Sequence, residues 1–245
     1  MNAYDYSRRK RLERAIKRLP GLVAYYPLNE TSGDAKNYAP ATKGSLDGSV
    51  TGATQGGVGQ LGRACSFDGV NDNIDIGDIA AINDATSLSI FVLAKFNNTT
   101  QDHYIFGNSA GASSGFIFIA DDAGFDTGRT NTFKIVVQES GTGTIVAKEY
   151  STDANTADIW EALMFTFAPD AVGGLKLYIN GIEDSQSPTN TSSVVNVGNS
   201  NAGLRIGESP GGGFDANASY QHFVALNRAL SATEARLIAH KGGFI

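Results

Sequence analysis

Acidic side chains outnumber basic ones in this sequence, 25 to 19, and their spacing decides what chemistry they could do. Cleavage of a glycosidic bond needs two carboxyl groups roughly 5–5.5 Å or 6.5–9.5 Å apart, projecting from one strand face. A run such as Glu-x-Asp-x-(x)-Glu would supply them, and none occurs. The nearest approaches, Asp121-Asp122 and the segment from Asp72 to Asp75, adjoin turn residues, where aspartates usually form Asx-turns. We therefore expect no catalytic acid pair.

Nucleophilic catalysis is not indicated either. His103, His222 and His240 stand apart from one another, and the sequence has no glycine-rich phosphate loop followed by lysine. Cys65 is the sole cysteine, so no intrachain disulfide can form, and we expect it to be a small buried apolar residue. The chain is therefore predicted not to be an enzyme.

Aromatic side chains on loops or sheet faces could bind a sugar, because their faces stack on it while Asn, Asp and Gln bond its hydroxyls. By position the ligand-binding candidates are Tyr104, Phe125 and Phe214, with Tyr150 and Tyr178 as further ones. Phe214 stands in a glycine-rich loop, which disfavours burial in a core. The alternative is that these aromatic residues are core residues, the commoner role of an aromatic in a β-sandwich.

Short apolar runs separated by turn residues predict strands along most of the chain. The run from Ser87 to Phe96 is apolar almost throughout, as expected for a strand buried on both faces. Ser231-Ala-Thr-Glu234 is a capping box that should begin a short helix, Ala232 to His240, ended by Gly242-Gly243. The expected strands are Leu22–Leu28, Arg63–Phe67, Asn73–Ile76, Ser87–Phe96, Tyr104–Phe106, Gly115–Ala120, Thr132–Gln138, Thr144–Tyr150, Trp160–Phe167, Leu175–Asn180, Val194–Val197, Leu204–Ile206 and Ser219–Leu226.

The stretch from Trp160 to Gly181 is the clearest of these patterns. Leu175, Leu177 and Ile179 alternate with polar residues, so one face of this strand is aliphatic. Asn180-Gly181 then favours a tight hairpin turn, because both residues accept positive φ. This stretch resembles the central signature of laminin-G-like, concanavalin A-like jelly rolls.

Three further blocks resemble the same family and follow in its order. They are the opening strand and acidic turn, Leu22 to Asp34, a second block, Gly62 to Asp72, and the closing strand and helix, Asn227 to Glu234. The resemblance spans about residues 20 to 241. It implies an all-β, two-sheet antiparallel jelly-roll sandwich with a short C-terminal helix, and a fold that carries both lectins and glycan-cleaving enzymes.

The resemblance also implies a calcium site, because family members often hold one calcium ion at the rim of the sandwich. Asp34, Asp68 and Asp72 lie in the two acidic turns that match family blocks, and carboxylates are ligands that calcium prefers. They are the predicted metal ligands. Against a full site, the chain has Gln221 and His222 where family members frequently carry acids. Ordinary turn-forming roles for the three aspartates are the alternative.

Residues 5 to 19 are predicted to form a basic helix that stops at Pro20-Gly21. Leu12, Ile16 and Leu19 recur at helical spacing and form one narrow apolar stripe. So short and so charged a helix is marginal alone, and we expect it to fold against a partner. We therefore divide the chain into an arm, residues 1–19, and a jelly-roll domain, residues 20–245.

Three roles are open for the arm: a solvated segment, a peg that docks on an acidic assembly or self-associates, and a binder of nucleic acid or an anionic membrane. We favour docking, since the stripe has no aromatic residues for a membrane anchor. The rest of the chain, with 12 basic and 23 acidic residues, is unsuited to nucleic acid. The predicted docking residues are Arg8, Arg9, Arg11, Leu12, Arg14, Ile16, Lys17, Arg18 and Leu19.

Two classes of function follow. The first is a non-enzymatic structural or adhesion module on a larger assembly. The sequence shows no secretory signal and no apolar run long enough to span a membrane. We therefore expect a phage virion protein made in the host cytoplasm, docked on capsid or tail proteins as a homo-oligomer, preferably a trimer. The second class is a carbohydrate-binding receptor-binding module of a cell-surface glycan, or a glycan depolymerase.

Overall fold

The alternating residues between Trp160 and Gly181 form two paired strands. Strand β11 (Trp160–Phe167) runs antiparallel to β12 (Leu175–Ile179), with Leu163 opposite Ile179 and Phe167 opposite Leu175. Asn180 and Gly181 both have positive φ, 51° and 78°, and turn the chain into β13 (Ile182–Glu183), as Asn-Gly predicts.

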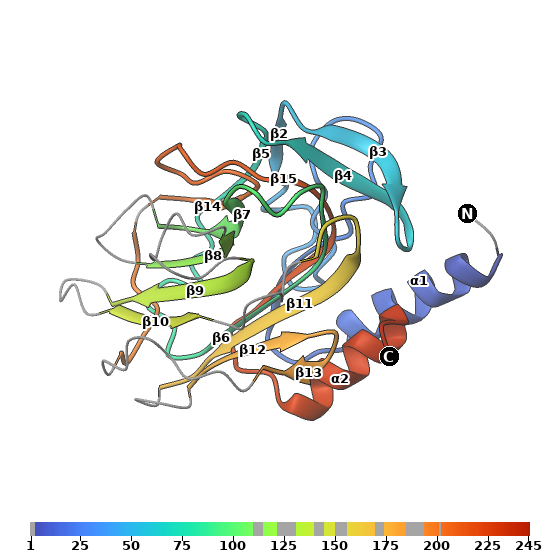
Figure 1. The fold of residues 1–245 in the computed structure, drawn as a ribbon. Helices are drawn as coiled ribbons and strands as arrows, with labels where there is room; N and C mark the ends of the chain where they lie inside the picture. The colour runs from blue at the N-terminus through green and yellow to red at the C-terminus, as the bar shows by residue number, and fades with distance from the viewer. Residues whose placement is uncertain are drawn as a thin grey trace.

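The computed structural model describes residues 3–109, 115–121, 131–139, 145–149, 156–169, 174–184, 194–200 and 202–245. Within these, two antiparallel sheets pack face to face (Figure 1). The first, sheet I, has the order β13-β12-β11-β6-β15-β4-β3, and β1 also pairs with β15. Its remaining strands are β1 (Leu22–Tyr26), β3 (Thr54–Gly59), β4 (Gly62–Asp68), β6 (Leu88–Phe96) and β15 (Asn217–Leu226).

The second sheet, sheet II, has the order β10-β9-β8-β7-β14-β5-β2. Both sheets are antiparallel, which confirms the predicted jelly-roll sandwich. The strands of sheet II are β2 (Ser49–Thr51), β5 (Asn73–Gly77), β7 (His103–Gly107), β8 (Gly115–Asp121), β9 (Thr132–Gln138), β10 (Ile145–Glu149) and β14 (Leu204–Ile206).

Aromatic side chains from both sheets fill the space between them. The rings of Phe106 in sheet II and Phe165 in sheet I stack at a centroid distance of 5.6 Å, and Phe223 meets Phe106 edge-on at 5.3 Å. Strand β6 is buried along almost its whole length, as predicted, because this core covers one face and a second core covers the other.

The second core lies between the outer face of sheet I and two helices, α1 (Ala3–Ile16) and α2 (Ala232–Gly242), which lie side by side (Figure 1). Leu12 and Ile16 are 0% exposed there, packed in one cluster with Ile238 of α2. The prediction of an arm that stands apart from the domain is therefore wrong. Its apolar stripe has an intramolecular partner, so Leu12 and Ile16 cannot serve as docking residues.

The α2 helix has the predicted capping box, in which Ser231 and Glu234 bond each other's backbone amides, and it ends at Gly243 with φ of 81°. The expected strands differ from the structure in two ways. Val194–Val197 is not a strand, and β2, β3 and β13 were not predicted. The sequence of β3, Thr-Gln-Gly-Gly-Val-Gly, is unlike a typical strand. In the described part of the chain, no helix is long and apolar enough to cross a bilayer.

Candidate ligand-binding rim

Three turns meet at one end of the sandwich, following β4, β6 and β14. The amide of Asn97 donates to the carbonyl of Asn217 at 3.0 Å, and Gln101 Nε2 donates to the carbonyl of Asp215 at 3.2 Å. Between the turns lies a cavity of about 340 Å³, which we call the rim pocket. It is lined by Gly69, Gln101, Asp102, Gly213, Phe214 and Asp215.

His103 fixes the wall that follows β6. Its Nδ1 accepts from the amide of Asn217 at 3.0 Å, so the imidazole proton is on Nε2, which donates to the carbonyl of Asn98 at 2.9 Å. The ring is 0% exposed and lies 5.1 Å from the ring of Phe96. With both nitrogens bonded to backbone groups, His103 positions the turn that carries Gln101.

A glycine-rich turn forms the opposite wall. The amide of Ser209 donates to the carbonyl of Phe214 at 3.1 Å, and Gly212 donates back to Ser209 at 2.8 Å. Gly212 and Gly213 have φ of 76° and 93°, a conformation that side chains other than glycine rarely adopt. The turn therefore presents a half-buried Phe214 at the pocket, as its glycine-rich surroundings predicted.

The rim is acidic because Asp68, Asp72, Glu208 and Asp215 lie close together. Burial raises the pKa of Asp215, and the charges of the other three acids raise it further. Burial also raises the pKa of Asp72, although the amide of Asp68 opposes this by donating to Asp72 Oδ2 at 2.8 Å. Asp215 Oδ1 is buried without a hydrogen-bond partner in the described structure. Of the acidic residues here, Asp102 and Asp215 line the pocket, and their carboxylates are the acceptors for a ligand rich in hydroxyl groups.

The predicted calcium ligands do not form one site. Asp68 and Asp72 belong to the rim, whereas Asp34 lies elsewhere and pairs with Lys36 at 3.4 Å, beside a second pair from Lys36 to Asp47 at 3.0 Å. No group of three or more His, Cys, Asp or Glu side chains among the described residues is placed to hold a metal ion. The two acidic turns match successive blocks of the family in the sequence, but they do not lie close together in the structure.

Of the predicted aromatic candidates, Phe214 lies at the pocket, whereas the prediction that Tyr104 binds a ligand is wrong. Tyr104 is 0% exposed on sheet II, its hydroxyl has no hydrogen-bond partner among the described residues, and burial raises its pKa. Tyr178 is buried in the second core. Phe125 and Tyr150 lie outside the described residues. Strand position alone did not reveal which tyrosines are covered.

Gln101 and Asp102 were missed as site residues. The available signal was the run of turn-forming residues from Asn97 to Thr100, in which Asn98 Oδ1 accepts from the amide of Thr100 at 3.1 Å. That signal marks a turn and says nothing of what the turn faces. Only the hydrogen bonds to Asp215 and to Asn217 of β15, more than a hundred residues away in the sequence, bring Gln101 to Phe214.

Comparison with known proteins agrees with this fold. A family model described as the concanavalin A-like lectin/glucanases superfamily matches residues 68–236. No curated protein sequence matches the chain significantly. Among solved structures, domain 4 of AbnA, an extracellular GH43 arabinanase of Geobacillus stearothermophilus in complex with arabinotriose, is similar with a TM-score of 0.63 and 17% identity, over 89% of this chain and 98% of that one.

Two larger proteins contain a similar part. The Trypanosoma rangeli sialidase matches 98% of this chain with 38% of its own, at 12% identity and a TM-score of 0.62. The receptor binding domain of botulinum neurotoxin D matches 90% of this chain with 52% of its own, at 10% identity and a TM-score of 0.60. At these identities the likeness concerns the fold, which hosts different functions.

Proposed function

Because the chain belongs to the concanavalin A-like lectin and glucanase superfamily, we propose that it is a non-catalytic carbohydrate-binding module whose ligand occupies the rim pocket. The observation that carries the proposal is the convergence of Phe214, Gln101 and Asp215 from separate turns on one cavity. An aromatic ring beside amide and carboxylate groups is the combination that sugars need, since they present both C–H faces and hydroxyl groups.

The size and charge of the pocket narrow the ligand. A cavity of about 340 Å³ lies at the small end of the range for ligand sites, which suits one or two sugar units at the end of a glycan. The acidic rim disfavours anionic sugars, so the ligand is a neutral saccharide. Domain 4 of AbnA, which was solved with arabinotriose, supports the idea that a domain of this shape can hold a short oligosaccharide.

The module is proposed to be non-catalytic because three of the four rim acids, all except Asp215, have structural partners. Asp68 Oδ1 accepts from the amide of Val70 at 3.0 Å, Asp72 Oδ2 from that of Asp68 at 2.8 Å, and Glu208 Oε2 from Asn73 Nδ2 at 2.7 Å. These bonds fix turns and leave the carboxylates poorly placed to move protons on a substrate. Calcium is a separate proposal, with Asp68 and Asp72 as its ligands, and binding should be measured with and without it.

A glycan array followed by calorimetric titration tests the proposal. Phe214→Ala and Gln101→Ala should each lower the affinity for the best saccharide about tenfold or more, which corresponds to losing one well-formed contact. Tyr6→Ala is the matched control, because Tyr6 is 49% exposed on α1, outside the rim pocket. An array without hits would overturn the proposal. Release of reducing ends from a bound polysaccharide would replace it with a depolymerase.

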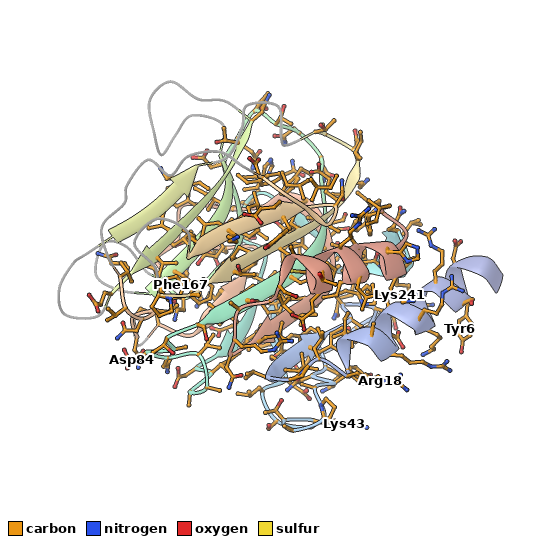
Figure 2. The ribbon with its side chains drawn as sticks, turned by 90° about the horizontal axis from the view of Figure 1, so that it is seen from below. Tyr6, Arg18, Lys43, Asp84, Phe167 and Lys241 are labelled. Atoms are coloured by element: carbon orange, nitrogen blue, oxygen red, sulfur yellow. The ribbon has the colours of Figure 1, made fainter. Side chains whose placement is uncertain are left out.

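A second candidate function, docking on a larger assembly, is favoured by a groove between α1 and α2. Its cavity of about 420 Å³ has apolar Leu19 and Leu237 beside Arg11, Arg14 and Arg18. In Figure 2, Lys241 marks α2 and Arg18 marks the segment that directly follows α1. Leu237 is 47% exposed. An acidic amphipathic segment of an assembly partner, such as the capsid or tail protein expected from the sequence, matches these charges.

A labelled synthetic peptide with leucine on one helical face and glutamate on the other tests this docking. Fluorescence anisotropy should show that the peptide binds the wild-type protein. The double substitution Arg14→Glu and Arg18→Glu should abolish this binding. Duplex DNA serves as the competing ligand in the same assay. Tighter binding to DNA, with affinity falling steeply as salt rises, would contradict a protein partner and restore the nucleic-acid alternative.

A further inference from the structure

A third cavity, of about 780 Å³, lies between α1 and the hairpin of β3 and β4. No aromatic side chain lines it, so it offers no ring on which a sugar could stack. We call it the helix–hairpin cleft. Its polar side chains are Asp5 and Arg9 of α1 together with Asn29, Gln60 and Arg63, and residues 56–59 and Gly62 supply the rest of the lining. No residue lines both this cleft and the rim pocket.

Gln221 holds the hairpin wall of the cleft. It is 1% exposed, accepts from the amide of Leu61 at 3.1 Å and donates from Nε2 to the carbonyl of Arg63. A Cβ at Gly59 would come within 2.4 Å of the Gln221 amide carbon, so only glycine lets the hairpin lie this close. The hairpin backbone is therefore preorganised, and the backbone position of Arg63 is fixed.

The helical wall is held as firmly. Leu12 and Ile16 anchor α1 in the second core, and Arg8 Nη2 donates to the carbonyl of Gly242 at 2.8 Å. Arg9 Nε lies 3.4 Å from Glu13 Oε1, and the guanidinium carbon of Arg9 is 5.5 Å from the centroid of the Tyr6 ring. These contacts restrict the Arg9 side chain, which lowers the entropy lost when it binds a ligand.

The charge of Arg9 also reaches the buried residues below it. His222 is 1% exposed, and its Nδ1 lies 2.8 Å from the hydroxyl of Tyr25. Burial and then the positive charge of Arg9 lower the pKa of His222 to about 3, so this histidine is neutral at physiological pH. The cations at the cleft are thus arginines, and Arg63 forms no ion pair within the described chain.

From this arrangement we infer that the helix–hairpin cleft binds a small hydroxylated molecule that carries an oxyanion, such as a sugar acid. Arginine matches carboxylate geometry through paired N–H groups, and Arg9 and Arg63 reach the cleft from different walls. Strand β3 is the edge of sheet I, so its outward backbone N–H groups take no strand partner in the described sheet and can also donate to an anion. Asp5, Asn29 and Gln60 accept the ligand's hydroxyl groups.

Calorimetric titration of the full chain with glucuronate, glucose and sulfate tests the inference. Glucuronate should bind more tightly than either of the others, because glucose lacks the anion and sulfate lacks the hydroxyl groups. Arg63→Ala should lower the affinity for glucuronate about tenfold or more, because it removes one charge-assisted contact. Arg236→Ala is the matched control, since Arg236 is an exposed arginine of α2 that does not line the cleft.

An observation on the unmodified protein keeps the test independent of folding defects. In wild-type protein, glucuronate should shift the backbone amide resonances of Gly57, Gly59 and Gln60 and leave those of Gly69 and Gly213 unchanged. Affinities for glucose and glucuronate that are equal would overturn the inference, and so would an undiminished affinity in a folded Arg63→Ala variant. Gly69 and Gly213 line the rim pocket, so their resonances would report any glucose that binds there, and failure of the inference at the cleft is distinguishable from failure of saccharide binding at the rim.

Discussion

The rim pocket and the helix–hairpin cleft belong to one chain but are held together in different ways. The rim is a meeting of turns joined by hydrogen bonds, such as the 3.0 Å bond from Asn97 to Asn217. The cleft has a helix for one wall, anchored by side chains that are 0% exposed, and a hairpin clamped by the buried amide of Gln221 for the other. The stability of the domain therefore depends on the walls of the cleft more than on the rim.

Their electrostatics differ as well. At the rim, burial and then neighbouring carboxylates raise the pKa of Asp215 and Asp72, whereas below the cleft burial and then the charge of Arg9 lower the pKa of His222. The rim should respond to pH through its acids, and the cleft should respond to salt through its arginines. The following changes break or sharpen this comparison, from the largest expected effect to the smallest.

Leu12→Ala should lower the free energy of unfolding by about 2–5 kcal/mol, because it leaves a cavity in the second core. Leu237→Ala is the control: Leu237 is 47% exposed, so its replacement should cost about 0.5 kcal/mol or less. Chemical denaturation measures both. Equal stabilities of Leu12→Ala and wild-type protein would mean that α1 stands free of the sandwich in solution.

Gln221→Ala should lower the free energy of unfolding by about 1–3 kcal/mol, since it leaves the Leu61 amide and the Arg63 carbonyl without their partner. It should also weaken glucuronate at the cleft and spare the saccharide at the rim. Gln101→Ala, which removes a half-buried amide from the rim, should show the reverse pattern in binding with a smaller loss of stability. Parallel losses at both sites would contradict their independence.

Asp215→Asn should stabilise the protein at neutral pH and have little effect in acid. The folded state raises the pKa of Asp215, so it binds more protons than the unfolded state between the ordinary and the raised pKa. The free energy of unfolding of the wild-type protein therefore falls as pH rises through that window. The Asp215→Asn variant does not lose this stability, because asparagine does not ionise. We expect a gain below about 1 kcal/mol, since the rim is partly solvated. Unfolding at about pH 3 and about pH 7 measures it.

The smallest expected effect is that of salt on ligand affinity, which should differ between the two sites. Raising ionic strength from about 0.1 M to about 1 M screens exposed charges, so glucuronate affinity at the cleft should fall several-fold. A neutral saccharide at the rim should bind with nearly unchanged affinity. Titrations in both buffers measure this contrast, and a larger salt dependence at the rim would reverse the assignment of charge to the two regions.

Much of the fold could be predicted because its pattern is local. The alternation from Leu175 to Ile179 and the capping box at Ser231 each depend on neighbouring residues. The placement of α1 could not be predicted, because an apolar stripe shows that a helix has a partner without showing which one. Its partner includes Ile238, which lies at the other end of the chain.

The site residues divide in the same way. Phe214 was predicted from its glycine-rich loop, whereas Gln101 and Asp102 reach the pocket only through the pairing of distant turns. Gln221 and His222 were noted as a departure from the acids frequent in the family. The structure gives them other roles, since Gln221 clamps the hairpin, and His222, with φ of 51°, lies in a bulge of β15.

The measurement that tests carbohydrate binding at the rim most directly is a crystal structure of the protein with the best saccharide from the array. The account predicts a sugar ring against Phe214, with hydroxyl groups bonded to Gln101 and Asp215. A saccharide bound instead on the outer face of sheet II, with the rim pocket empty, would contradict it.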